Sequence, residues 1–339
     1  MNRAASSYAA ALAALGLCGV AGCALRPAPD LFPQRLPASL AADAPLAVVG
    51  DLQQTSAFVL KVMHREETAA EQDRLIEDLR ARKDELAGLV IVGDLVFTAA
   101  SKSDWRRFDE LVGPLAGEIP ILPAIGNHDY YCVFVQKCLH NVVPKSFRLR
   151  FPWFAPGTPH MVAYGEIALL FLDTETDLAA QGRWLETELD SLESSYRAAL
   201  VFFHRPPFTN AVTRGSVPDE AVQAEIVPRL RASALTTVVI AGHVHGYEHF
   251  VVDGIHYITS GGGGGPRAML GAERPNDVYA GPDCVRDEAG EVRRPFNYLL
   301  IEPRRDEIEI TVRGLCKTDA AVHVIETFTV PFASADAVN

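Results

Sequence analysis

Two histidines spaced two residues apart give the first indication of chemistry in this chain. An apolar run over residues 237–241 ends in Gly242, and His243 and His245 follow it. On extended backbone, side chains two residues apart lie on the same side of the chain, so both imidazoles face one way. Such a pair can hold a metal ion, although two exposed histidines at the start of a loop are commoner. The polar residues that follow the other apolar runs of the sequence decide between these interpretations.

Four further apolar runs each end in residues that can bind a metal. These residues are, in chain order, Asp51 and Gln53; Asp94; Asn127, His128 and Asp129; and His204. Asp and Asn are also favoured turn residues, so each break alone has an ordinary explanation. Carboxylates, amide oxygens and imidazoles together suit Fe, Mn and Zn. Their repetition after successive apolar runs therefore indicates a metal site.

The elements that must position these residues alternate between strand and helix. Apolar runs of strand length cover residues 45–51, 88–94 and 119–126, with helical periodicity over 66–86 and after Ser103, which we expect to cap its helix. This rhythm predicts a parallel sheet with right-handed crossovers. Ligands gather at the carboxyl ends of the strands in such sheets, which is where these polar breaks lie.

The second half of the chain repeats this rhythm. The expected elements are a hairpin over residues 161–172, a helix after Thr176 or Asp177, a strand over 198–203, a helix over 218–232 interrupted at Pro228, a second hairpin turning at Asp253 and Gly254, a loop over 266–295, and antiparallel strands over 297–301, 307–312 and 323–330. Five consecutive glycines, residues 261–265, follow the second hairpin. They favour a tight exit from the strand, although such a backbone can also form an anion-binding nest.

Residues 130–160 show no periodicity and form an insertion loop. They hold Cys132 and Cys138, and aromatic side chains concentrate between residues 147 and 154. Two interpretations are open: a substrate-recognition loop, or a disulfide-pinned lid that packs its aromatic side chains on the core.

Residues 1–22 have the features of an export signal. A polar start with Arg3 precedes an apolar stretch, and Val20-Ala21-Gly22-Cys23 follows. This tetrapeptide resembles the lipobox of bacterial lipoproteins, which implies cleavage before Cys23, lipidation of its sulfur and anchoring on the periplasmic side of a membrane. An ordinary signal peptide or an anchor helix is the alternative, although the stretch is short of the ~20 residues that span a bilayer. Residues 23–45 are then expected to be a tether, and residues 46–332 the folded domain.

Length and charge limit the class of protein. The chain has 339 residues, of which 48% are hydrophobic, so it can bury a substantial core. Its 31 basic and 43 acidic residues give a net charge of −12. An acidic surface repels nucleic acid and anionic membrane, so neither is expected as a partner, and membrane contact is expected only through the lipid anchor. A small phosphorylated substrate would need local positive charge, which bound cations supply; the sequence indicates no oligomeric state.

Four cysteines remain if Cys18 is removed and Cys23 is lipidated. They are Cys132, Cys138, Cys284 and Cys316. In an oxidising compartment an even number suggests disulfides, and three pairings are possible. We expect the least demanding one, Cys132–Cys138 with Cys284–Cys316. The alternative is four unrelated buried thiols, whereas zinc ligation is disfavoured because the chain has no C-x-x-C motif.

The motifs taken together resemble those of the calcineurin-like metallophosphoesterases. Gly126-Asn127-His128-Asp129 and the segment from Gly242 to Glu248 look nearest to the purple acid phosphatase branch. The resemblance implies an α/β fold, a four-layer α/β/β/α sandwich of two mixed sheets flanked by helices. It also implies a metal-dependent hydrolase of phosphate esters, either a phosphomonoesterase or a phosphodiesterase.

The resemblance further implies two divalent or trivalent metal ions, Fe, Mn or Zn. By similarity, Asp51, Gln53, Asp94 and His245 would hold the first ion, and Asp94, Asn127, His204 and His243 the second, with Asp94 bridging. Two such ions lie ~3.5–4 Å apart, supply a metal-bound hydroxide for in-line attack and neutralise the phosphoryl oxygens. His128 is similar to the family histidine that contacts the phosphoryl group or protonates the leaving oxygen. Asp129 is expected to orient its imidazole.

Two positions depart from the family pattern. Family members commonly carry histidine where Gln53 stands, and purple acid phosphatases carry a metal-binding tyrosine where Phe97 stands. A neutral amide oxygen is the weaker donor, and a phenyl ring offers none. The first metal site is therefore expected to be weak, changed in metal preference or vacant. The alternative function is a catalytically impaired, lipid-anchored binding or scaffold protein that kept the fold.

Overall fold

The computed structural model of the protein describes residues 31–54, 65–133, 136–137, 145–213 and 215–333. The expected export signal, the lipobox with Cys23, and Cys138 lie outside the described residues. Within the described part, no helix is both long and apolar enough to cross a membrane.

A mixed six-stranded sheet contains the strands of the first half. In spatial order it consists of β17 (His323–Pro331), β16 (Glu307–Leu315), β15 (Phe296–Pro303), β2 (Leu46–Val49), β3 (Gly88–Val92) and β4 (Ile121–Ala124). The strands β2, β3 and β4 run parallel, as expected. The three closing strands are antiparallel, also as expected, and β15 pairs with β2.

Two helices cover the outer face of this sheet. They are α3 (Ala69–Ala81), followed by a 3-10 turn over Lys83–Glu85, and α4 (Lys102–Ala116). Their apolar stripes bury Leu75 and Leu79 from α3, and Trp105 and Phe108 from α4. Ser101 caps α4, because its backbone is extended and its hydroxyl accepts a hydrogen bond from the Asp104 amide; the expected cap, Ser103, lies inside the helix.

A mixed seven-stranded sheet contains the strands of the second half. Its spatial order is β1 (Ser39–Leu40), β7 (His160–Tyr164), β8 (Ile167–Phe171), β9 (Ala198–Phe202), β10 (Thr236–Ala241), β12 (Ile255–Ser260) and β11 (Tyr247–Val252). Both expected hairpins are present as the antiparallel pairs β7–β8 and β11–β12, and β8, β9, β10 and β12 run parallel. Asp253 and Gly254 turn the second hairpin with φ of 52° and 78°, which suits the twist of paired strands.

Three helices cover the outer face of the second sheet. They are α6 (Leu178–Leu192), α7 (Glu220–Glu225) and α8 (Val227–Ala232). Asp177 caps α6 through its carboxylate, which accepts a hydrogen bond from the Ala180 amide at 3.0 Å. The expected helix over residues 218–232 divides between α7 and α8, and Pro228 lies in the first turn of α8, where its missing N–H costs no hydrogen bond.

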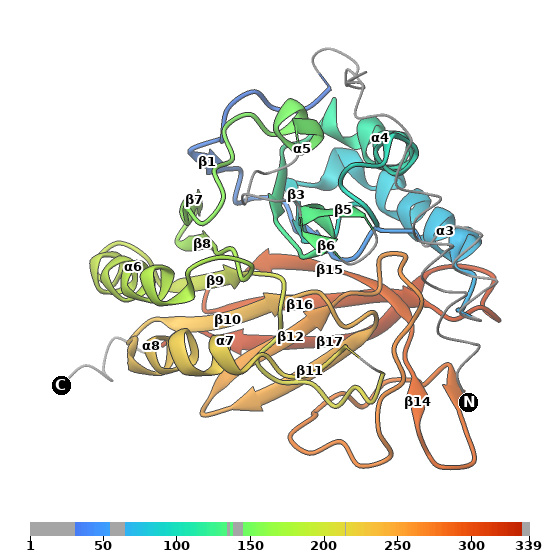
Figure 1. Cartoon of the computed structure of the whole chain (residues 1–339). Helices are drawn as coiled ribbons and strands as arrows, with labels where there is room; N and C mark the ends of the chain where they lie inside the picture. Colours follow the sequence, from blue (N-terminus) through green and yellow to red (C-terminus); the bar gives the residue numbers. More distant parts are fainter. Residues whose placement is uncertain (1–30, 55–64, 134–135, 138–144, 214, 334–339) are drawn as a thin grey trace, which may run out of the picture.

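The two sheets pack face to face, with the helices outside them (Figure 1). Val48 and Val90 of the six-stranded sheet share one buried cluster with Leu200 and Ile240 of the other. The parallel strands are buried on both faces, as near-continuous apolar runs predict. The expected four-layer α/β/β/α sandwich of two mixed sheets is confirmed.

Residues 31–45 of the expected tether pack on this sandwich. Phe32 is only 3% exposed; its ring centroid lies 5.7 Å from that of Phe108 and 5.4 Å from that of Phe151. The strand β1 adds to β7 in parallel and buries Leu40. This part of the chain therefore belongs to the folded domain, because a few large apolar side chains in a Pro/Ala-rich segment suffice to dock it.

The described part of the insertion holds short elements and an aromatic cluster. The elements are β5 (Tyr131–Val133), which pairs with β6 (Gln136–Lys137), and α5 (Lys145–Arg150). Phe147, Phe151 and Phe154 are buried in the core beside Trp105. Arg150 lies over the Trp105 ring, 4.5 Å from its centroid, and forms an ion pair with Asp109. The aromatic side chains thus pack on the core, as the second interpretation of this segment requires.

A short hairpin and a disulfide organise the expected loop over residues 266–295. The hairpin consists of β13 (Val285–Arg286) and β14 (Val292–Arg293), which are too short for periodicity to indicate. Cys284 and Cys316 form a disulfide with their Cα atoms 5.3 Å apart. Cys132 also takes part in a disulfide, but since Cys138 is not described, that pairing stays a prediction.

Candidate metal centre

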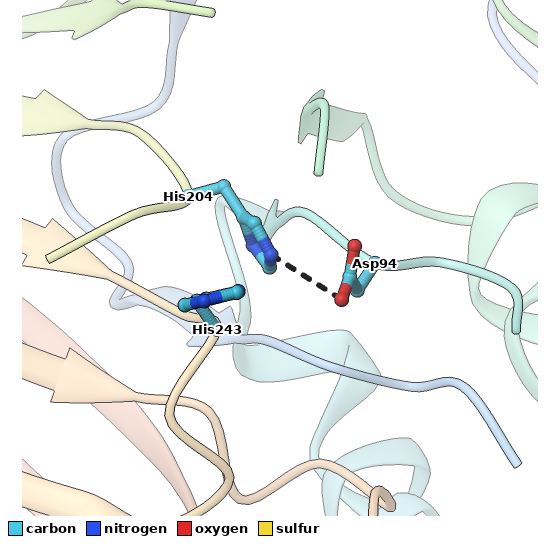
Figure 2. Close-up of side chains that lie close together, drawn as sticks. All are labelled: Asp94, His204 and His243. Carbon is cyan, nitrogen blue, oxygen red and sulfur yellow. Dashed lines mark ion pairs between the residues drawn. The ribbon is translucent and has the colours of Figure 1, made fainter. Parts of the chain in front are cut away.

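The polar residues that follow five strands meet at one site between the two sheets. Asp94 comes directly after Gly93 at the end of β3, His204 follows β9, and His243 follows β10. Figure 2 shows these three side chains converging from separate strand ends. Asp51 and His245 join them from the ends of β2 and β10. The strands carry apolar side chains up to their last residue and polar ones immediately after, so the core ends where the site begins.

The backbone at three of these residues is strained. Asp51, Asp94 and His243 have φ of 57°, 52° and 68°, the left-handed region that favours glycine. Each such residue costs about 1–3 kcal/mol, so the surrounding structure must hold it in place. The sharp turn after each strand directs the carboxylate or imidazole back into the site.

The site contains two groups of potential ligands that share one residue. Asp94, His204 and His243 form one group, and Asp51, Asp94 and His245 the other; within each group the potential ligand atoms lie within 4.8 Å of one another. We call Asp51, Gln53, Asp94 and His245 the first cluster, and Asp94, Asn127, His204 and His243 the second cluster. Asp94 thus belongs to both groups, the position that the family resemblance implies for it.

Potential ligand atoms converge in the second cluster. His204 Nε2 lies 3.3 Å from Asp94 Oδ2 and 3.2 Å from Asn127 Oδ1. The imidazole is oriented by its Nδ1–H, which donates to the Val92 carbonyl at 2.9 Å, and Asn127 is oriented by its Nδ2–H, which donates to the Tyr131 hydroxyl at 3.1 Å. Both residues therefore direct one N–H away from the site and turn His204 Nε2 and Asn127 Oδ1 into it.

The electrostatics of the second cluster favour positive charge at its centre. Burial alone would lower the pKa of His204, but the Asp94 carboxylate raises it to about 9. Burial alone would raise the pKa of Asp94, but His204 and His128 hold it below its usual range. An acceptor-rich, buried pocket of this kind needs a proton or a cation, so the second cluster fits a metal ion.

The first cluster contains a donor as well as acceptors. Asp51 Oδ2 accepts a hydrogen bond from the His243 amide at 2.8 Å, and Asp51 Oδ1 lies 3.4 Å from His245 Nε2. Burial raises the pKa of Asp51. Gln53 Nε2 lies 3.1 Å from Asp94 Oδ2 and 2.9 Å from His245 Nε2, while its Oε1 is buried with no hydrogen-bond partner among the described residues. The carboxylates and the imidazole fit a cation, whereas this orientation of the Gln53 amide does not.

His128 lies beside Asp94, and its ring is oriented by a backbone carbonyl. Its amide donates to Asp94 Oδ1 at 2.8 Å, and its Nδ1 lies 2.7 Å from the Phe97 carbonyl oxygen. The ring centroid is 5.0 Å from that of Phe97 and 4.8 Å from that of Tyr131. Burial lowers the pKa of His128.

The expectation that Asp129 orients His128 is wrong. Asp129 Oδ1 accepts a hydrogen bond from the Leu95 amide at 3.0 Å, and its Oδ2 accepts one from the Gly126 amide at 2.9 Å. Adjacent residues of the 3-10 turn over His128–Tyr130 point in different directions, so Asp129 faces inward. Its role is to join the turns after β3 and β4, and burial raises its pKa well above the usual range.

Two further polar residues, which sequence reasoning missed, border the second cluster. Tyr131 fixes the Asn127 amide, as described above, and Arg205 Nη1 lies 3.2 Å from His243 Nε2. Arg205 also forms an ion pair with Glu175. The available signal was their position: Arg205 follows His204 directly, and Tyr131 comes two residues after Asp129.

Glycines allow the backbone to approach the ligands closely. A Cβ atom at Gly126 would lie 2.3 Å from Asp94 Oδ1, and one at Gly265 would lie 2.4 Å from His245 Nδ1. Within the glycine run, the Gly263 amide donates to the Gly50 carbonyl at 2.9 Å and the Gly265 amide to the Asp51 carbonyl at 3.1 Å. These amides are used in packing the run against the turn after β2, which favours the tight exit over the anion nest.

Comparisons with known proteins agree with this geometry. The sequence profile described as calcineurin-like phosphoesterase matches residues 44–247. The chain is 24% identical over 234 residues to probable inactive purple acid phosphatase 9 of Arabidopsis thaliana, which covers 59% of this chain and 36% of that protein. It is 28% identical over 166 residues to purple acid phosphatase 18 of the same plant, which covers 47% and 37%. The chain thus spans well under half the length of these curated relatives.

The solved structure of the purple acid phosphatase PPD1 from yellow lupin (Lupinus luteus) has a similar fold. The TM-score is 0.68 at 15% sequence identity, and the match covers 90% of this chain and 56% of the lupin chain. At this identity the likeness concerns the fold alone.

Proposed function

The chain belongs to the calcineurin-like phosphoesterase family, and on that premise we propose that it hydrolyses phosphate esters with a dinuclear metal site. The observation that carries the proposal is the pair of ligand clusters that share Asp94. Asp94 Oδ2 faces both clusters, at 3.3 Å from His204 Nε2 and 3.1 Å from Gln53 Nε2. Its other oxygen is fixed by the His128 amide. A carboxylate held in this way suits a bridging position.

The chain offers a complete ligand set for one cation and a partial set for another. Asp94, Asn127, His204 and His243 would hold the second ion, and Asp51, Asp94 and His245, with Gln53, the first. When bound, Fe, Mn or Zn ions would activate water for in-line attack on phosphorus and neutralise charge on the phosphoryl oxygens. No side-chain nucleophile is required, and the described residues around the clusters are ligands, donors and packing groups.

His128 is proposed to contact the phosphoryl group or to protonate the leaving oxygen. The Phe97 carbonyl holds Nδ1 at 2.7 Å, which leaves Nε2 for the substrate. Tyr131 and Arg205 border the same cluster, where a hydroxyl and a guanidinium can bind phosphoryl oxygens. His128→Ala should retain bound metal and slow hydrolysis by ~10²–10⁴-fold, the usual contribution of a general acid–base group.

The test is hydrolysis by purified protein that has been stripped of metal and reloaded separately with Mn, Fe or Zn. The panel consists of small phosphate monoesters, phosphodiesters and a pyrophosphate, each measured with and without chelator. We expect turnover that needs metal and is lost with chelator. Turnover that survives the chelator after complete metal removal would reject the mechanism.

A second candidate is a catalytically impaired binding or scaffold protein with this fold. The inward-facing N–H of Gln53 favours it, as does the word "inactive" in the name of one relative. Protein that binds metal but turns over no member of the panel would support this candidate.

We further propose that the mature protein is anchored to the periplasmic side of a membrane through acyl chains on Cys23. The lipobox-like tetrapeptide is the support for this. Mass spectrometry of the membrane fraction should find a lipidated Cys23 at the N-terminus, and Cys23→Ala should leave an uncleaved precursor. An unmodified mature N-terminus at another residue would reject the anchor.

A further inference from the structure

We infer that the NH₂ group of the Gln53 side chain occupies the place of the first cation. The amide must rotate, so that Oε1 and Nε2 exchange positions, before a cation binds in the first cluster. The inference deepens the proposed function and rests on it in one respect, namely that the first cluster is a cation site. It concerns the order in which the two clusters fill.

The Gln53 NH₂ group satisfies two of the atoms that a cation would bind. Gln53 Nε2 lies 3.1 Å from Asp94 Oδ2 and 2.9 Å from His245 Nε2. In its neutral form His245 uses its Nδ1–H on the Pro266 carbonyl at 2.9 Å, so Nε2 carries the lone pair. The two N–H bonds of one amide can therefore serve the carboxylate and the imidazole together.

The opposite side of the same amide is left unsatisfied. Gln53 is 2% exposed, and its Oε1 has no hydrogen-bond partner within the described ranges. A buried carbonyl oxygen without a donor is costly. Without a cation and with His245 neutral, exchanging the positions of Oε1 and Nε2 would be worse, because Oε1 would then meet Asp94 Oδ2 and the lone pair of His245 Nε2, and all three atoms are acceptors.

A bound cation reverses this preference. Oε1 can then serve as a ligand, whereas the N–H bonds would point at a positive charge. The amide thus has two orientations, and the cation selects between them. Phe97 lines the same cavity as Gln53, and its side chain has no polar atom that could replace the amide oxygen as a ligand.

The second cluster needs no such rearrangement. Asn127 already turns Oδ1 into the site, at 3.2 Å from His204 Nε2, and the Tyr131 hydroxyl accepts its N–H. The second cluster should therefore fill first. Loss of the two Gln53 hydrogen bonds should make the first cluster about 10- to 100-fold weaker in Kd, from the usual net strength of such bonds.

Calorimetric titration of metal-free protein with Zn²⁺ or Mn²⁺ tests the order of filling. We compare the wild type with Gln53→Glu, which has the same shape but carries only acceptors. The control is Gln54→Glu, which adds the same charge one residue away, where the wild-type amide donates to Gln72 Oε1 at 2.7 Å.

The wild type should show two unequal steps, or one step of one ion per chain. Gln53→Glu should bind two ions with Kd values at least about tenfold closer together, since the donor has been removed and a charged ligand added. Gln54→Glu should keep the wild-type pattern. Two equal tight steps in the wild type, or the same pattern in Gln53→Glu as in the wild type, would overturn the inference.

A second measurement uses the unaltered chain, in case Gln53→Glu does not fold. The ¹⁵N side-chain amide signal of Gln53 should shift only slightly during the first equivalent of Zn²⁺, through the shared Asp94, and should undergo its main shift beyond it. A shift that is complete within the first equivalent would overturn the inference. Neither measurement requires turnover, so a protein that hydrolyses nothing would reject the proposed function without touching this result.

Discussion

The two clusters contain similar residue types and share Asp94, but they differ in what surrounds the ligands. In the second cluster, the Val92 carbonyl and the Tyr131 hydroxyl accept N–H bonds of His204 and Asn127, so that His204 Nε2 and Asn127 Oδ1 face the site. In the first cluster, no described residue donates to Gln53 Oε1, and the amide turns its N–H bonds inward. The hydrogen-bond partner of a ligand side chain therefore determines which of its atoms faces the metal site. The residue type alone does not determine this.

Removing the residue common to both clusters should have the largest effect. Asp94→Asn keeps the size of the side chain but takes the shared charge from both clusters. We expect kcat/KM to fall by more than the ~10²–10⁴-fold of losing a general acid–base group, because metal binding fails as well. Elemental analysis should find little bound metal, and Asp84→Asn at an exposed position is the control. Full activity with a normal metal content would contradict the bridging role.

Removing one histidine from each cluster should separate the two. His204→Ala disables the second cluster and His245→Ala the first. Because the first cluster is the weaker one, we expect His204→Ala to lower kcat/KM about 10- to 100-fold more than His245→Ala, matching the hydrogen bonds that oppose binding there. Steady-state kinetics at a Mn²⁺ concentration that does not saturate the first cluster measure this ratio. Equal losses would mean that the two clusters contribute alike.

The buried carboxyl group of Glu248 makes a pH-dependent contribution to stability, and it contacts the loop that follows His204. Glu248 on β11 accepts hydrogen bonds from Thr209 Oγ1 at 2.6 Å and from the Asn210 amide at 2.8 Å, on the loop that follows His204. Burial raises the pKa of Glu248 from its ordinary value of 4.5 to about 7. The folded state thus binds the proton more tightly than the unfolded chain, so the contribution to stability is fully present below pH 4.5 and is lost as the pH rises to 7.

Glu248→Gln should remove this dependence. From the shift in pKa, the free energy of unfolding should fall by about 3 kcal/mol more in the wild type than in the variant as the pH rises from 4.5 to 7. Urea titrations at both pH values measure the difference. Parallel curves for the two proteins would show that Glu248 is ionised in the folded state throughout this range.

Adding a phenol beside the first cluster should have the smallest effect on stability, but it should change the absorption spectrum of the iron-loaded protein. Iron-loaded wild type should lack a tyrosinate-to-iron charge-transfer band, because Phe97 stands where purple acid phosphatases carry the ligand. Phe97→Tyr should gain such a band, with stability changed by no more than about 1 kcal/mol. Absorption spectra of both iron-loaded proteins give the answer. A band of equal strength in the wild type would show that another phenolate, such as Tyr131, reaches the iron.

The sequence was sufficient to predict where the ligands meet, because apolar runs that end in polar residues are read directly from the chain. Parallel strands bring those ends together, which predicts the single site where Asp51, Asp94, His204, His243 and His245 lie. The parallel strands follow from the same runs, whereas the four-layer sandwich follows from the family resemblance.

Contacts between residues that are far apart in the chain could not be predicted from the sequence. Asp129 was assigned to His128 because the two are adjacent, yet its partners are backbone amides of Leu95 and Gly126. The orientation of the Gln53 amide depends on Asp94 and His245, which lie far from it in the chain. Similarly, composition predicts a tether over residues 23–45, whereas Phe32 packs against the aromatic rings of Phe108 and Phe151.

If the proposed lipid anchor is present, the docking of Phe32 would limit how far the protein can move from the membrane. If Cys23 carries the proposed acyl chains, only residues 24–30 separate it from Leu31, which packs against the same core cluster as Phe32. Seven residues span at most about 25 Å when fully extended. The folded domain would then stay within a thin layer of solution next to the bilayer. Substrates released at or carried along that surface would meet it far more often than those in the bulk.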